Sequence, residues 1–148
     1  MARADDSEAR ARLRADGFRR VREAHQTELA EDYVELIADL IEETGEARVV
    51  DLAGRLGVSN ATVNNTIQRL QRDGFVTSKP YRSIFLTRQG HALARSARER
   101  HQIVREFLIA LGVAPDTADA DAEGIEHHVS EDTLEAFRAF LKRNPKAG

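Results

Sequence analysis

The stretch VVDLAGRLGVSNATVNNTIQRLQRDGFV, residues 49–76, restricts the fold more than any other part of the chain. A short helix from Val50 to Leu56 is broken at Gly57, and Ser59 can cap a second helix that stops at Gly74. Two short helices around a glycine-containing turn predict a helix-turn-helix.

The second helix of this pair turns Val63, Ile67 and Leu70 inward, and its outer face is rich in amides and arginine. Such side chains can hydrogen-bond to base edges in a major groove, which predicts contact with double-stranded DNA. The candidate DNA contacts on this helix are Ser59, Asn60, Thr62, Asn64, Asn65, Gln68, Arg69 and Arg72.

Two short alternating segments, 75–77 and 83–86, follow this helix and are joined by the turn SKPYR. A β-hairpin directly after a recognition helix is a wing, and Lys79 and Arg82 at its tip would lie over DNA phosphates. Residues 50–105 carry ten Lys or Arg against three Asp or Glu, whereas both flanking segments are acidic. A basic centre suits contact with a polyanion, although such charge runs are usually only solvated surface.

The segments before and after the helix-turn-helix and hairpin also have helical periodicity. LAEDYVELIADLIEETG, residues 29–45, has apolar side chains at three- and four-residue steps and predicts an amphipathic helix that extends back toward Phe18. A long helix capped by Thr87 is expected to end at Gly112, followed by a short helix near 114–120 and a last helix over about 130–143. Residues 1–17 have few core formers, and we expect a mobile or marginally helical arm.

Composition excludes several classes of site. The chain of 148 residues has no cysteine, so disulfides, thiolate ligands and a cysteine nucleophile are ruled out. Its single methionine is Met1, so a thioether ligand is not expected either. No stretch approaches the roughly 18–20 apolar residues of a membrane span, and the charged N-terminus has no apolar signal core. We therefore expect a bacterial-type cytoplasmic protein.

Side chains that bind metals stand in three places far apart in the sequence. EDYVE has an acidic pair three residues apart, EGIEHH has a set at i, i+3 and i+4, and the long helix has a histidine near its middle. Together they are Asp32, Glu35, His101, Glu123, Glu126 and His127. This set of oxygens and imidazoles without sulfur suits a divalent first-row metal, manganese or iron ahead of calcium, and could hold two carboxylate-bridged ions.

Each of these pieces also has an ordinary structural explanation. Acidic pairs at i, i+3 are mostly solvated helix surface, and a lone histidine is more often a surface residue than a ligand. EGIEHH leaves metal binding and solvated surface equally open. Two other classes stay in view: a metal-independent winged-helix regulator, and a carboxylate-bridged di-metal enzyme, for which no nucleophile or base is present beyond the ligands themselves.

The order of the motifs resembles the DtxR/MntR family of metalloregulators, in its manganese-responsive branch. The resemblance runs from about Phe18 to Phe140 and rests on EDYVELI, GEARVVDLAGRLGVSNATV, IFLTRQG, RERHQIVREFL, LGV and DAEGIEHHVS. It implies a mainly α fold with a small β-wing. The expected division is an N-terminal arm (1–17), a winged helix-turn-helix DNA-binding domain (18–88) and a helical metal-binding and dimerisation domain (89–148).

The resemblance also implies a function, which is that of a repressor and not of an enzyme. Members of the family are homodimers that bind palindromic operators when metal is present. In this chain the resemblance implies that the six residues above are the ligands, with Glu35, Glu123 and Glu126 able to bridge two ions. No membrane or small-molecule substrate is expected as a partner. His128 matches a position outside the usual ligand set.

The metal that the resemblance implies is manganese. The iron-responsive branch typically has Met and Cys at the positions of Asp32 and Glu123, so the two carboxylates favour Mn²⁺, one or two ions per subunit. Fe²⁺ or Zn²⁺ could still bind in vitro. The expected targets are manganese uptake genes; the alternatives are an iron-responsive member of the family and a metal-independent winged-helix regulator.

Overall fold

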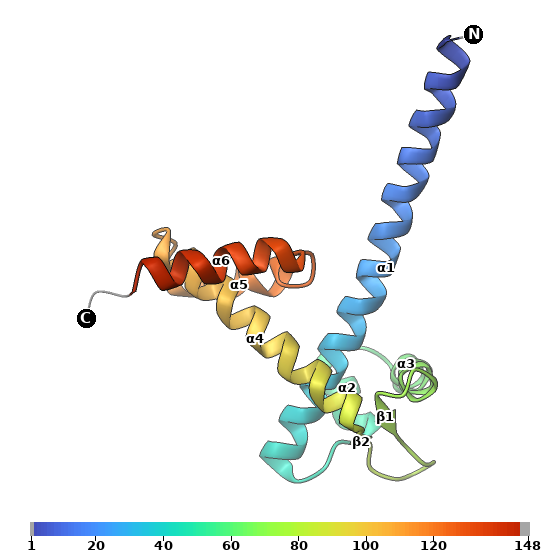
Figure 1. Ribbon diagram of the computed structural model, residues 1–148. Helices are drawn as coiled ribbons and strands as arrows, with labels where there is room; N and C mark the ends of the chain where they lie inside the picture. The colour runs from blue at the N-terminus through green and yellow to red at the C-terminus, as the bar shows by residue number, and fades with distance from the viewer. Residues whose placement is uncertain (1, 146–148) are drawn as a thin grey trace.

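The computed structural model describes residues 2–145, which form six helices and one two-stranded antiparallel sheet (Figure 1). In chain order the elements are α1 (Ala2–Thr44), α2 (Val49–Leu56), α3 (Asn60–Arg72), β1 (Val76–Thr77), β2 (Phe85–Leu86), α4 (Arg88–Ala110), α5 (Pro115–Ile125) and α6 (Glu131–Arg143). The predicted fold class, mainly α with a small β-wing, is confirmed. No helix within residues 2–145 combines the length and apolar character that crossing a membrane requires.

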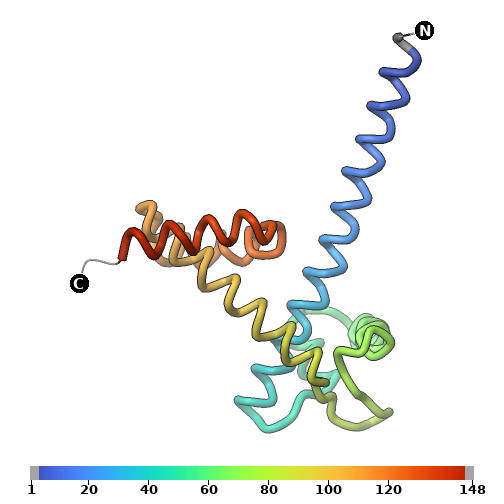
Figure 2. The backbone as a smooth tube through the Cα atoms, in the orientation of Figure 1, coloured from blue at the N-terminus to red at the C-terminus, as the bar shows by residue number. Residues whose placement is uncertain are grey.

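Helix α1 is longer than the sequence indicates. Residues 2–17, expected to form a mobile or marginally helical arm, are helical and continuous with the rest of α1. The N-terminal half of α1 projects away from the remaining elements (Figures 1 and 2). The side chains of residues 4–23 are all exposed. Its alanines and arginines are good helix formers, and ion pairs such as Asp6 with Arg10 at 2.9 Å join neighbouring turns.

Helices α2 and α3 form the predicted helix-turn-helix. Gly57 takes the left-handed conformation after α2, with φ of +67°, and the hydroxyl of Ser59 accepts the N–H of Thr62 at 3.1 Å to cap α3. Val63, Ile67 and Leu70 are buried as expected, in a core shared with α1, α2 and the wing. Thr66 is also buried, and its hydroxyl is satisfied by donating to the carbonyl of Thr62.

The wing strands are shorter than predicted. β1 and β2 pair Val76 with Leu86 and Thr77 with Phe85. Ile84 was expected in the second strand, but it forms a separate bridge with Ala47, and its N–H donates to the Ala47 carbonyl at 2.8 Å. Ile84 therefore pairs with Ala47 in the loop after α1 and does not extend the pairing of β2 with β1.

Gly90 lies where the first turn of α4 meets the wing. A Cβ at this position would lie 2.1 Å from the carbonyl oxygen of Phe75. We expect Gly90→Ala to lower the free energy of unfolding by about 1–3 kcal/mol, because α4 must move away from the Phe75 backbone. Urea unfolding followed by circular dichroism measures this loss.

The control for this variant is Gly54→Ala in α2, where a Cβ has nothing within 4 Å. Alanine there should raise the free energy of unfolding by up to about 1 kcal/mol, since glycine weakens a helix interior. If the two variants showed equal stability, the close contact at Gly90 would not limit the packing of α4.

Helix α4 packs against α1, α5 and α6 and so joins the two halves of the chain. Its C-terminal part contributes Val104 to a second core with Ala122 and Leu134. Helix α5 is longer than the expected segment 114–120 and continues through Gly124 to Ile125. Glu123 is therefore helical, and Glu126 and His127 lie in the turn that follows α5.

Candidate metal centre

Ligand-type side chains gather in two adjacent groups, each with ligand atoms within 4.8 Å of one another: His101, Glu123 and Glu126, and Glu28, Asp32 and His127. They come from α4, from α1 and from the end of α5. The two groups touch, because Oε1 of Glu126 is 3.3 Å from Nε2 of His127. Five of the six candidate metal ligands predicted from the sequence therefore meet in one place, together with Glu28, which was not predicted.

Glu35, the sixth candidate, belongs to neither group but lies within reach of their charges. Burial raises its pKa to about 7, and the negative charges of Glu123 and Asp32 add to the rise. Its Oε1 atom is buried without a hydrogen-bond partner among residues 2–145. The side chain is thus held next to the centre in an environment that disfavours a bare carboxylate.

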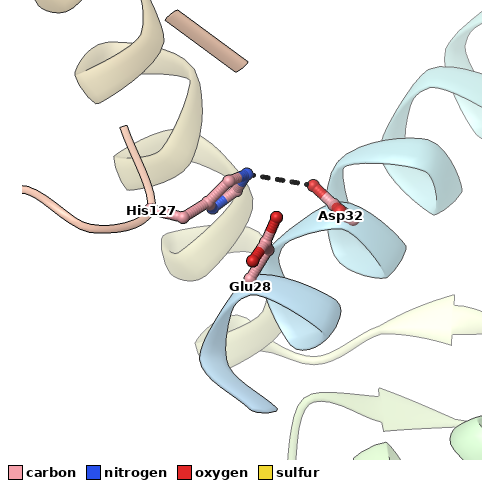
Figure 3. Close-up of side chains that lie close together, drawn as sticks. All are labelled: Glu28, Asp32 and His127. Atoms are coloured by element: carbon pink, nitrogen blue, oxygen red, sulfur yellow. Dashed lines mark ion pairs between the residues drawn. The ribbon is translucent and has the colours of Figure 1, made fainter. Parts of the chain in front are cut away.

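His127 is oriented through both of its ring nitrogens. Its Nδ1 is 2.7 Å from Oε2 of Glu31, and its Nε2 is 3.2 Å from Oδ1 of Asp32. Figure 3 shows the ring reaching from the turn after α5 toward Glu28 and Asp32 on α1. The hydrogen bonds with Asp32 and then Glu31 raise the pKa of His127 to about 10. Because Glu31 occupies Nδ1, the ring presents Nε2 to a metal.

His101 presents its other nitrogen to the centre. Its Nδ1 is 2.9 Å from Oε2 of Glu126 and 3.5 Å from Oε1 of Glu123. Its Nε2 points away, 3.6 Å from Oδ1 of Asp119, and that carboxylate is 2.5 Å from Nε of Arg105. One nitrogen of each histidine therefore faces the acidic centre, and the other faces a carboxylate behind it.

A divalent cation fits this set of donors. Oε1 of Glu35, Nδ1 of His101 and Oε2 of Glu126 are buried atoms without an aligned hydrogen bond in the described part of the chain. Burial, followed by the charge of Glu123, raises the pKa of Glu126 to about 8. Buried polar atoms normally have partners, and these oxygen and nitrogen atoms are ligands that a hard to borderline divalent metal accepts.

Two acidic residues behind the histidines were not identified from the sequence. Glu31 is 2% exposed, and its Oε1 accepts a hydrogen bond from Arg100 at 3.2 Å. Asp119 stands behind His101 in the same way, with Arg105 as its partner. Carboxylates in this position fix the orientation of a ligating imidazole and raise its basicity. The one sequence signal is that both arginines flank His101 in RERHQIVRE.

We expect Glu31→Gln to weaken Mn²⁺ binding by about 10- to 100-fold, the usual effect of losing a carboxylate behind a histidine ligand. The amide lacks the negative charge that binds the His127 ring through Oε2 and Arg100 through Oε1. The electron paramagnetic resonance signal of free Mn²⁺ measures the affinity. Glu42→Gln, at an exposed position of the same helix, is the matched control and should bind as the parent chain does. Equal affinities in both variants would contradict the role of Glu31.

The candidate DNA contacts are exposed, and five of the ten line one groove. Asn60, Asn64 and Gln68 of α3 line a groove together with Lys79 and Arg82 of the hairpin. The side chains of Thr62, Asn65, Arg69 and Arg72 are also exposed. Ser59 is exposed as well, but its hydroxyl is engaged in capping α3. Base contact by these residues stays a prediction.

Comparison with known proteins gives two family models that together match most of the chain. The iron dependent repressor N-terminal DNA binding domain matches residues 25–84. The iron dependent repressor metal binding and dimerisation domain matches residues 87–146. The boundary between the two matches falls just before α4.

Curated relatives are similar over most of their own length. The chain is 58% identical over 129 residues to the transcriptional regulator MntR of Escherichia coli O6:H1, covering 87% of this chain and 83% of that protein. It is 37% identical over 131 residues to the HTH-type transcriptional regulator MntR of Geobacillus kaustophilus, covering 77% of this chain and 93% of that protein.

Solved structures with the same fold include a manganese-dependent transcriptional repressor in complex with manganese, with a TM-score of 0.67 at 30% identity. The manganese regulator SloR gives a TM-score of 0.65 at 28% identity. Each match covers 76% of this chain, and the chain spans about half of those two proteins, 52% and 53%. The chain therefore belongs to the DtxR/MntR family of metalloregulators, as its motifs predict.

Proposed function

We propose that this chain is a homodimeric transcriptional repressor that binds palindromic operators of manganese uptake genes, with Mn²⁺ as its co-repressor. The proposed ligands are Asp32, Glu35, His101, Glu123, Glu126 and His127. One observation carries the proposal: an oxygen-rich set of donors joins α1 to α4 and the end of α5, and three buried polar atoms there lack an aligned hydrogen bond. The similarity to two MntR regulators supports manganese as the metal.

The centre joins the two parts of the proposed mechanism. Asp32 and Glu35 belong to α1, which packs into the helix-turn-helix core through Ile37 and Leu40. The other proposed ligands belong to α4 and the end of α5, within the region that matches the dimerisation domain. The proposed division is a DNA-binding domain over residues 18–88 and a metal-binding and dimerisation domain over residues 89–148.

Electrostatics couple these two parts. Asp32, Glu123 and Glu126 converge on one centre, so Glu126 keeps a proton at neutral pH in the metal-free chain, and its ionisation would add a repulsion that opposes the close approach of α1 and α5. Bound Mn²⁺ supplies the positive charge that makes their convergence favourable. The carboxylates and imidazoles then hold α1 at one angle to α4 and α5, and α3 keeps a fixed position relative to the dimer.

A fixed position of α3 matters because the proposed dimer is twofold. Its two recognition helices must match operator half-sites about 34 Å apart, or a multiple of that spacing. Asn60, Asn64 and Gln68 are proposed to read base edges, while Lys79 and Arg82 at the wing contact phosphates. A chain already fixed by its ligands loses less freedom on the operator, so metal and DNA bind with positive coupling. Such a regulator works in the bacterial cytoplasm, where the DNA is.

The test is operator binding measured by fluorescence anisotropy, with DNA selected from a random-sequence pool by the Mn²⁺-loaded protein. Free Mn²⁺, Fe²⁺ and Zn²⁺ are compared at matched concentrations. We expect Mn²⁺ to tighten binding by about 5- to 150-fold, the range of typical allosteric coupling. Equal affinity with and without Mn²⁺ would overturn the proposal, and a response to Fe²⁺ alone would make the chain an iron regulator.

A further inference from the structure

Another cluster of ligand-type side chains lies beside the metal centre and uses none of its six proposed ligands. His25 and Glu28 lie on one face of α1, and His128 lies in the turn after α5. Glu28 connects the cluster to the centre, because its carboxylate lies within 4.8 Å of ligand atoms of Asp32 and His127. The two histidines of EGIEHH therefore have different neighbours: His127 lies in the metal centre, and His128 lies beside Glu28 and His25.

Both histidines direct a ring nitrogen to the same oxygen of Glu28. Nδ1 of His25 is 3.7 Å from Oε2 of Glu28, and Nε2 of His128 is 3.5 Å from it. The ring centroids of the histidines are 6.3 Å apart and the ring planes cross at 83°. The rings are therefore not stacked on each other, and their nitrogens converge on the carboxylate.

The two distances to Glu28 are too long for direct hydrogen bonds and match the spacing of two ligand atoms on one cation. Separations of 3.5 and 3.7 Å are longer than a nitrogen–oxygen hydrogen bond. Two ligand atoms each about 2.0–2.2 Å from a tetrahedral ion lie roughly 3.3–3.6 Å apart, which is close to the observed spacing. By contrast, the 2.7 Å distance from His127 to Glu31 leaves no room for an ion between them.

The cluster is also open to solvent. The side chains of His25 and His128 are 69% and 48% exposed, whereas that of Glu28 is 29% exposed. An ion could reach the three ligands directly and keep water in its remaining coordination positions. Two imidazoles and one carboxylate favour ions late in the first transition series, such as Zn²⁺, more strongly than Mn²⁺.

We propose that His25, Glu28 and His128 form an accessory site for a divalent transition-metal ion of the Zn²⁺ type, separate from the six-residue centre. The ion would fasten the base of the projecting half of α1 to the turn after α5. This assignment rests on the three side chains and does not depend on the proposed function as a manganese repressor.

Zinc stoichiometry of the full chain tests the site. Metal-free protein is titrated with Zn²⁺ against a chromophoric chelator, and bound zinc is counted per chain. His25→Ala and His128→Ala should each lose one equivalent relative to the parent chain and to the control His91→Ala, an exposed histidine on α4 outside the cluster. Unchanged zinc stoichiometry and affinity in both variants would overturn the accessory site.

Mn²⁺ binding, followed by electron paramagnetic resonance, separates this site from the main centre. His25→Ala should retain the Mn²⁺ affinity of the parent chain, and its loss would show that the cluster belongs to the main centre. Conversely, Glu126→Ala should keep the zinc equivalent that depends on His25 and His128. The zinc measurement therefore still tests the accessory site if the main centre proves not to bind Mn²⁺.

Discussion

Glu126→Ala is expected to remove the metal response of DNA binding and to leave a folded chain. Glu126 is the side chain that reaches both ligand groups: Oε1 is 3.3 Å from Nε2 of His127, and Oε2 is 2.9 Å from Nδ1 of His101. Alanine removes both contacts, so the remaining donors no longer join α1 to α4. Operator affinity in Mn²⁺ should fall to the metal-free level, a loss of about 5- to 150-fold.

The fold should tolerate this change because Glu126 is costly to bury. The side chain is 1% exposed, and burial raises its pKa to about 8, so the folded chain disfavours its charged form. Circular dichroism and size-exclusion chromatography should therefore match the parent chain. Glu99→Ala, at an exposed position of α4, is the control and should keep the full response. A Mn²⁺ response that survives in Glu126→Ala would show that this carboxylate is dispensable.

The helix-turn-helix could be predicted from the sequence because its signals are local. Gly57, Ser59 and Gly74 mark the helix ends within a few residues, and period-3.6 apolar spacing identifies the inward face. Continuity of α1 through residues 2–17 was missed because the segment has few core formers. It is helical through its own propensity and short-range ion pairs, without burial.

The metal centre could be predicted only in part. Helical spacing identifies the pair Asp32 and Glu35 and the motif EGIEHH. That these segments, some ninety residues apart, come together depends on the packing of α4 against α1 and α5, which spacing does not predict. Glu31 shows the limit: it lies in an amphipathic helix, where an acidic residue is normally solvated, yet it is buried by its pairing with Arg100 and His127. Burial that depends on distant partners leaves no local pattern.

Mn²⁺ affinity is expected to rise by about 10²- to 10⁴-fold between pH 6 and pH 8, because metal ligands must lose their protons before they bind. The pKa of Glu35 is raised to about 7, that of Glu126 to about 8 and that of His127 to about 10. All three therefore hold a proton at pH 6, and raising the pH removes competing protons. Resonance titrations at three pH values measure the slope, and calorimetry in buffers of different ionisation enthalpy counts the protons released. An affinity independent of pH would contradict these protonation states.

The same pKa shifts act on the stability of the metal-free chain in the opposite direction. Glu35 and Glu126 have folded-state pKa values raised from 4.5, so their contribution to stability is complete below about pH 4.5 and is lost as the pH rises through 7 and 8. The contribution of His127 is complete below its unfolded pKa of 6.5 and is lost as the pH rises toward 10. Thermal melts should therefore show Tm falling from pH 5.5 to pH 8 without metal. Saturating Mn²⁺ should raise Tm more at pH 8 than at pH 5.5, because tighter binding stabilises the folded state further. A stabilisation by Mn²⁺ that is equal at both pH values would mean that proton release is not coupled to binding at this centre.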